Sequence, residues 1–363
     1  MSQEIHYTSP TVDGWRLRLF RYPAETSKKA ETPVILCHGL ASNRYAVDFG
    51  EYKSKNWYKY SLAAFLSNGG EDKNISFDVW VVELRGRGSP PTFLPDESPE
   101  KYIWCVDDYI DKDISVIIKY VQEWYKKELN RETKVFWIGK SMGGMIIYAY
   151  GEREKGKKNL KGVVTLGSPT TFKREPLFLK ILTRLCPRRI AIPINAAEFL
   201  NNLPEFKRKL IEYGTNHSNT DPRIIEEFID KGMNNTISSK VLNHFSIFFR
   251  HHTFCRYPTT PWIYDLLDGI PYIESFVSPY SYTDNLCRFT TPLLAIGGAA
   301  DTVAPPYEIY YNVKHVGSKD TSYVILSKDN GYNYDYGHLD LTLGKYARED
   351  VYPIIYRWLV ERD

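Results

Sequence analysis

Long hydrophobic runs are absent from this 363-residue sequence. None approaches the roughly 18 consecutive apolar residues of a membrane-spanning helix. The first residues, MSQEIH, lack the charged start and apolar centre of a signal peptide. Hydrophobic residues still make up 43% of the chain and charged residues 25%, the balance of a globular protein with a sizeable core. We therefore expect a cytoplasmic protein without an integral membrane segment.

Cysteine is scarce, and its spacing excludes two classes of site. The five cysteines are odd in number, widely separated and without a C-x-x-C pair: Cys37, Cys105, Cys186, Cys255 and Cys287. This pattern argues against a disulfide framework and against a zinc site. The adjacent His251 and His252 do not suggest a metal pair, because neighbouring side chains on a helix point apart. We expect free thiols in or near the core, and neither a metal nor a cofactor.

An excess of one charge is also missing. Lysine and arginine total 47 against 44 acidic residues, a net charge of +3, and the basic residues are scattered among acidic ones. No basic face for nucleic acid follows from this distribution. The expected partner is a small molecule, and the oligomeric state is left open.

Apolar, β-branched runs alternate with segments of helical period, which is the pattern of a mainly parallel sheet flanked by helices. The runs that predict strands are 15–22, 34–37, 77–84, 135–138, 163–166, 293–296 and 323–326. Helices are predicted at 61–67, 113–129 and 350–361. The chain is therefore predicted to fold as an α/β protein.

The alternation stops between positions 167 and 292, where helical periodicity and turn signals occur without a convincing strand. Candidate helices there are 176–185, 196–213, 223–231 and 238–249, followed by an aromatic, proline-rich stretch at 254–282. We interpret this region as an inserted helical cap. The predicted division is a core of residues 1–170 and 286–363 and a cap of residues 171–285.

The most informative motif is Gly139-Lys140-Ser141-Met142-Gly143, which lies between a predicted strand and an apolar stretch long enough for a helix. The pentapeptide alone is a weak signal, but a strand before it and a helix after it are typical of a nucleophile elbow. Glycines two residues before and after the serine leave room for close backbone approach. Ser141 is therefore the candidate nucleophile.

A serine hydroxyl needs a base and an acid that orients this base. Asp301 follows the strand and small-residue turn LAIGGAA, and His338 follows the last predicted strand. They are the candidate acid and base. The acid could instead be one of three nearby aspartates, Asp329, Asp335 or Asp340, and His38 is interpreted as an architectural residue of its loop.

An oxyanion formed during acyl transfer needs preorganised N–H donors. The backbone N–H of Met142, directly after the nucleophile, is one candidate. The N–H of Leu40, which follows Cys37-His38-Gly39 at the end of a predicted strand, is the other.

Five segments together carry a resemblance to a known family: VILCHGLASN, FDVWVVELRGRG, GKSMG, PLLAIGGAADTVAPP and YGHLDLTLGK. They resemble the α/β-hydrolase fold, in its lipase-like and polyhydroxyalkanoate-synthase-like branch. The matching segments span about residues 15–359 and exclude most of the predicted helical cap, which is inserted before the strand that carries the acid. The resemblance implies Ser141 as nucleophile, Asp301 as orienting acid, His338 as general base and then acid, and Leu40 with Met142 as the oxyanion hole.

Two positions depart from the family pattern. The polymer synthases have cysteine where this chain has Ser141, which argues against synthase activity. Glu83 stands where many members have aspartate, which we interpret as structural variation.

The predicted function is hydrolysis of carboxylic esters of hydrophobic acyl groups through an acyl-enzyme, because an aromatic, helical cap would form a mostly apolar pocket. An acyltransferase that uses the same intermediate is an alternative. A non-catalytic ligand-binding protein that keeps the fold is another. A dehalogenase is disfavoured because its nucleophile at position 141 would be aspartate.

Overall fold

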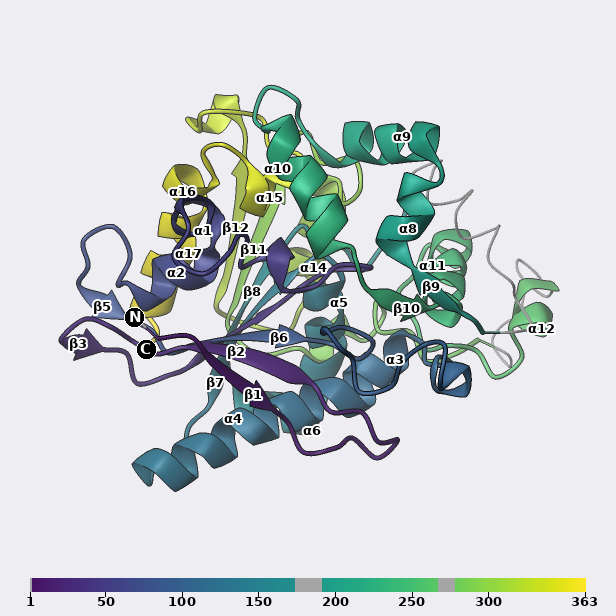
Figure 1. Ribbon diagram of the computed structural model, residues 1–363, viewed down its shortest axis with the longest axis horizontal. Helices are drawn as coiled ribbons and strands as arrows, with labels where there is room; N and C mark the ends of the chain where they lie inside the picture. Colours follow the sequence, from purple (N-terminus) through teal and green to yellow (C-terminus); the bar gives the residue numbers. More distant parts are fainter. Residues whose placement is uncertain (1, 174–190, 267–277) are drawn as a thin grey trace.

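The computed structural model describes residues 2–173, 191–266 and 278–363 (Figure 1). An eight-stranded sheet forms its centre, with the strands in the order β1-β2-β6-β4-β7-β8-β11-β12. β2 is antiparallel to both of its neighbours, and every other neighbouring pair is parallel. The strands are β1 (Glu4–Tyr7), β2 (Arg18–Tyr22), β4 (Val34–Cys37), β6 (Val79–Glu83), β7 (Val135–Lys140), β8 (Leu160–Leu166), β11 (Leu293–Gly298) and β12 (Thr321–Leu326). The predicted α/β class with a mainly parallel sheet is confirmed.

Helices cover both faces of this sheet because successive strand residues point to opposite sides. On β4, Ile35 and Cys37 belong to one buried apolar cluster, and Val34 and Leu36 belong to the other. The first cluster includes residues of α4 (Ile114–Leu129), α5 (Met142–Gly151) and α14 (Pro306–His315). The second includes residues of α1 (Lys55–Tyr60), α2 (Leu62–Ser67), α15 (Asp340–Leu343), α16 (Ala347–Asp350) and α17 (Tyr352–Val360).

Shorter elements connect these layers. β3 (Lys28–Lys29) pairs with β5 (Ile75–Ser76). Other short helices are η1 (Arg44–Ala46), η2 (Pro99–Lys101), α3 (Val106–Asp108), η3 (Tyr109–Asp113), α6 (Glu154–Asn159), η5 (Leu286–Arg288) and η6 (Lys328–Asn330). η3 is a π-helix that runs directly into α4, so the helix predicted at 113–129 is the α-helical part, Ile114–Leu129, of a longer helical segment that begins at Val106.

Between β8 and β11, the described residues form mainly helices, which Figure 1 shows in teal and green above and to the right of the sheet. They are α8 (Ala196–Asn201), α9 (Pro204–Gly214), α10 (Pro222–Glu227), η4 (Phe228–Gly232), α11 (Ser239–His251) and α12 (Pro261–Leu266). The helix predicted at 176–185 lies outside the described residues. The division into core and cap remains a prediction.

Two expectations for this region were wrong. A two-stranded antiparallel ribbon pairs β9 (Pro193–Asn195) with β10 (Thr236–Ser238), although we predicted no strand there. The single helix predicted at 196–213 is two helices, because Leu203 takes a non-helical backbone and Pro204 starts α9. Proline lacks an N–H and clashes with the preceding turn, so it fits the first position of a helix but not the interior.

Within the described residues, no helix combines the length and hydrophobicity needed to cross a bilayer. Cys37, Cys105 and Cys255 are buried free thiols, whereas Cys287 is an exposed one. Cys186 lies in the part of the chain that is not described.

Candidate active site

Ser141 lies on a strained turn between β7 and α5. Its φ of 53° and ψ of −120° fall outside the regions that residues other than glycine ordinarily adopt. A hydrogen bond to the neighbouring strand β8 stabilises the turn: the Ser141 N–H donates to the carbonyl of Leu166 at 2.8 Å. Strain of this kind typically costs about 1–3 kcal/mol and occurs at functional sites, where the surrounding structure maintains it.

The two glycines of the motif permit this turn. A Cβ atom on Gly139 would lie 2.3 Å from the carbonyl oxygen of Gly143. A Cβ on Gly143 would lie 2.6 Å from the carbonyl oxygens of Cys37 and His38. Contacts this short are impossible without moving the backbone. The glycines predicted to permit close approach therefore do so.

His338 and Asp301 come together from two different loops. His338 follows β12, Asp301 follows β11, and Nδ1 of the imidazole lies 2.8 Å from Oδ2 of the carboxylate. The other carboxylate oxygen accepts the N–H groups of Val303 and Ala304 at 2.9 and 2.7 Å, which fixes the orientation of Asp301. Since a carboxylate only accepts, Nδ1 of His338 is the donor and Nε2 keeps a free lone pair.

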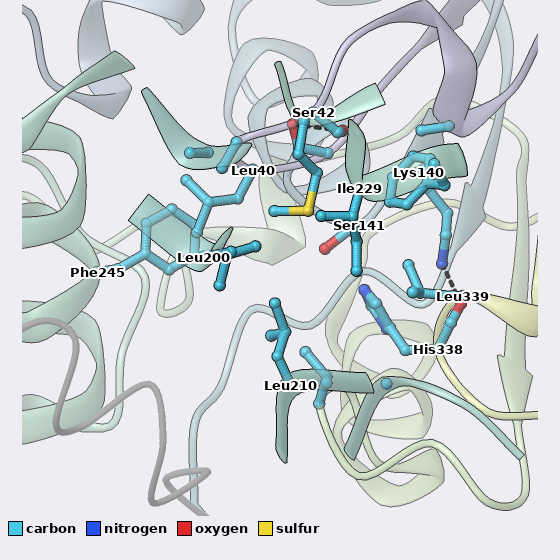
Figure 2. A pocket seen from close by; sticks show the side chains of 18 of the residues that line it. Leu40, Ser42, Lys140, Ser141, Leu200, Leu210, Ile229, Phe245, His338 and Leu339 are labelled. Atoms are coloured by element: carbon cyan, nitrogen blue, oxygen red, sulfur yellow. Dashed lines mark hydrogen bonds between the residues drawn. The ribbon is translucent and has the colours of Figure 1, made fainter. Parts of the chain in front are cut away.

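Figure 2 shows the ring of His338 turned toward the Ser141 hydroxyl. Within the described residues, no hydrogen bond joins the two side chains. Catalytic hydrogen bonds commonly shorten only when substrate binds. Burial lowers the pKa of His338 below its usual value, helped by the positive charge of Lys140 and opposed by Asp301. The imidazole is therefore neutral at pH 7, as a general base requires.

The three alternative acids lie elsewhere. Asp340 is buried, and its carboxylate accepts the N–H groups of Gly337 and Asn216. Asp335 accepts the N–H of Lys328, and Asp329 is exposed. Of the four candidates, the structure places Asp301 against the imidazole.

The candidate oxyanion donors belong to the residue after Ser141 and to the loop after β4. Met142 is the first residue of α5, where N–H groups have no acceptor within the helix and the helix dipole favours negative charge. Leu40 lines the same cavity as Ser141. His38 is buried, with Nδ1 donating to the carbonyl of Gly39 and Nε2 accepting the N–H of Leu84. Burial, followed by the charge of Arg87, lowers the pKa of His38 to about 3, so the architectural interpretation of His38 fits its surroundings.

Ser141 and His338 open into a cavity of about 180 Å³ (Figure 2). Its lining comes from the loop after β4, from the start of α5, from the segments that carry Asp301 and His338, and from the elements between β8 and β11. The lining is almost entirely apolar: Leu40, Met145, Phe199, Leu200, Phe206, Leu210, Ile211, Phe228, Ile229, Met233, Ile237, Leu242, Phe245 and Phe249. A space of this composition suits a hydrocarbon chain better than a sugar or a charged peptide.

The comparison with known families decides the classification. Residues 32–331 match the family described as "alpha/beta hydrolase fold". The chain belongs to this family. The fold expected from the sequence motifs is therefore confirmed.

The relatives of this α/β hydrolase include lipases and esterases. Triacylglycerol lipase 1 of Arabidopsis thaliana is 22% identical over 374 residues, covering 94% of this chain and 83% of the lipase. A soluble variant of monoglyceride lipase from Saccharomyces cerevisiae superposes with a TM-score of 0.62 at 15% identity, over 100% of this chain and 96% of that one. A thermophilic esterase from Thermogutta terrifontis gives 0.58 at 17% identity, over 99% of both chains. At sequence identities this low, the similarity between the structures shows a shared fold and nothing further.

Two residues next to the reactive groups of this α/β hydrolase were not singled out from the sequence. Lys140, the first variable residue of the G-x-S-x-G motif, is only 3% exposed and points toward the His338 loop (Figure 2). Gly167 follows β8 with a positive φ, and a Cβ there would lie 3.1 Å from both Asp301 Oδ2 and His338 Nδ1. A charged residue inside an otherwise apolar run was the available signal for Lys140. Nothing local marks Gly167.

The C-terminal end of α9 is hydrogen-bonded to both loops of the site. The carbonyl of Tyr213 accepts the hydroxyl of Thr302, which is the neighbour of Asp301. The carbonyl of Gly214 accepts the N–H of Leu339, the neighbour of His338. Because α9 also lines the cavity, the wall of the cavity and the two loops form one hydrogen-bonded unit.

One buried group has the composition of a metal site. The candidate ligand atoms of Cys105, Asp107 and His244 lie within 4.8 Å of one another. However, both ring nitrogens of His244 are engaged, by the carbonyl of Cys255 and the N–H of Val106. Both oxygens of Asp107 also accept hydrogen bonds, from the hydroxyl of Tyr282 and the N–H of Tyr257. Burial raises the pKa of the Cys105 thiol, so these residues fit a satisfied polar network better than an ion.

Proposed function

We propose that this α/β hydrolase is a serine hydrolase that cleaves carboxylic esters of hydrophobic acyl groups. One observation carries the proposal: Ser141 and an imidazole held by Asp301 face each other inside one apolar cavity. The lipases and esterases among its relatives support the same reaction class.

In the first half-reaction, Ser141 Oγ forms a bond to the ester carbonyl carbon while its proton passes to Nε2 of His338. The carbonyl oxygen becomes an oxyanion, which accepts hydrogen bonds from the N–H groups of Leu40 and Met142. The intermediate then collapses. The bond to the alcohol oxygen breaks, His338 returns the proton to this oxygen, and the acyl group stays on Ser141.

In the second half-reaction, water takes the place of the alcohol. His338 accepts a proton from water as the oxygen attacks the acyl carbon, and the proton then returns to Ser141 Oγ as the acid leaves. Asp301 keeps its charge throughout and stabilises the imidazolium.

The cavity sets the expected preference among esters. Each methylene buried in an apolar site gains about 0.8 kcal/mol, which is about fourfold in kcat/KM. We therefore expect kcat/KM to rise along a series of straight-chain p-nitrophenyl esters until the cavity is filled, and then to level off.

The test compares wild type with Ser141→Ala on this ester series, with the free carboxylic acid measured as product. Loss of the nucleophile should lower kcat by about 10⁶-fold. Ser318→Ala is the matched control. Ser318 lies in the loop that leads into β12, at the end of the parallel strands opposite to the one that carries Ser141. Equal hydrolysis by wild type and Ser141→Ala would overturn the proposal. Transfer of the acyl group to an added alcohol, without release of acid, would favour an acyltransferase instead.

A further inference from the structure

Lys140 is a buried cation beside the candidate nucleophile. It is the last residue of β7, so its backbone precedes the Ser141 turn directly, and its side chain is 3% exposed. Burying an ammonium group is costly unless hydrogen bonds and opposite charges compensate. A buried lysine in this position therefore needs a hydrogen-bond acceptor or a negative charge among the residues around it.

The partner is the His338 loop. Lys140 Nζ donates to the backbone carbonyl oxygen of His338 at 2.5 Å, the bond drawn as a dashed line beside Leu339 in Figure 2. His338 is thus held at two points: its ring by Asp301 and its backbone by Lys140. The residue that holds the backbone, Lys140, directly precedes Ser141. This bond links the nucleophile and the base across two loops that are far apart in the sequence.

Two carboxylates interact with the Lys140 ammonium group, one from each of the segments that carry Asp301 and His338. Asp301 lies on the loop after β11 and Asp340 at the start of α15, and both carboxylates attract Lys140. The imidazole of His338 is the third titratable group that interacts with it. Burial lowers the pKa of Lys140 to about 8 despite the two carboxylates. The ammonium is therefore charged at neutral pH and loses its proton in mildly alkaline solution.

We propose that Lys140 is a positioning residue of the hydrolytic site, which fixes the His338 backbone relative to Ser141 through its bond to the His338 carbonyl. The inference rests on the proposed function. It assigns Lys140 no contact with substrate and no proton transfer. Without this bond, the His338 loop keeps its hydrogen bonds to Asp301 and to the carbonyl of Gly214, but it loses its hydrogen bond to the residue that precedes Ser141.

The test uses Lys140→Met, which keeps the apolar stem and removes the charge and the donor. We expect kcat to fall about 10- to 100-fold, since small misplacements of a catalytic group have effects of this size, with KM for a short ester nearly unchanged. The acid limb of the kcat/KM profile should also move to higher pH, because the positive charge of Lys140 lowers the pKa of His338. Lys134→Met is the control, since Lys134 is exposed directly before β7.

A kcat near that of wild type, or a loss of kcat without movement of the acid limb, would overturn the proposal. If Lys140→Met does not fold, Lys140→Gln serves for the same profile. If neither variant folds, the dependence of the wild-type kcat on pH tests the proposal. A neutral amine is a weaker donor, so kcat should decline as pH rises through about 8, and constant kcat up to pH 10 would contradict the role.

The two proposals fail differently. Ester hydrolysis that survives in Ser141→Ala removes the proposed function. Hydrolysis that depends on Ser141 but is indifferent to Lys140 removes only this inference.

Discussion

Substituting Gly167 by alanine should perturb the active site without replacing any of its reactive residues. Gly167 has a φ of 57°, and an added Cβ would lie 3.1 Å from Asp301 Oδ2, 3.1 Å from His338 Nδ1 and 3.2 Å from His338 Cε1. Ordinary van der Waals contact begins near 3.4 Å. The Asp301 and His338 side chains must therefore shift by a few tenths of an ångström, away from the position that their 2.8 Å hydrogen bond defines.

Two effects should follow. Alanine in the left-handed region costs about 1–2 kcal/mol, which should lower the free energy of unfolding by this amount. Displacement of the imidazole should lower kcat about tenfold, since a misplacement of 1 Å can cost about 100-fold. Chemical denaturation measures the first effect, and steady-state hydrolysis of p-nitrophenyl butyrate measures the second.

Gly331→Ala separates the two effects. Gly331 also has a positive φ, 86°, but no atom lies within 4 Å of the position of its Cβ. This variant should lose similar stability and keep the kcat of wild type. If Gly167→Ala and Gly331→Ala have the same kcat, the reasoning about the Asp301 and His338 pair is refuted.

Three other predictions concern the same site. Asp301→Asn should lower kcat about 10⁴-fold in steady-state assays, because an amide does not hold the imidazole in the required tautomer; a loss under tenfold would contradict this role. Leu210→Trp should lower kcat/KM for a dodecanoate ester at least about tenfold and spare the acetate ester, whereas Leu203→Trp, at an exposed position before α9, should change neither. Because burial lowers the pKa of His338, kcat/KM should be full at neutral pH and fall only as pH drops through a value below 6.5; an acid limb above 6.5 would be inconsistent with the buried ring.

The turn that carries Ser141 was predictable because its signals are local. The strand before it and the helix after it are continuous buried runs, and the glycines that allow the turn stand at fixed positions around Ser141. The order of Asp301 and His338 along the chain, each after a predicted strand, placed both at the same edge of a parallel sheet. The sequence favoured Asp301 but left its three alternatives open, because the final choice depends on which carboxylate reaches the imidazole.

Other features depend on contacts that local patterns do not encode. β1 was missed because Ile5 and Tyr7 are half exposed, so the strand carries no strong apolar alternation. β9 and β10 have three residues each, too few for a period to emerge. Lys140 finds its partner 198 residues away along the chain. Contacts at such sequence distances become visible only when the sheet is assembled.

The most direct measurement is the site of covalent modification by a fluorophosphonate, which reacts with an activated serine. Peptide mapping by mass spectrometry should find the phosphonate on Ser141 in the wild type, and Ser141→Ala should remain unlabelled under the same conditions. Labelling of Ser141→Ala to the same extent as wild type, or modification at a different residue, would contradict the account.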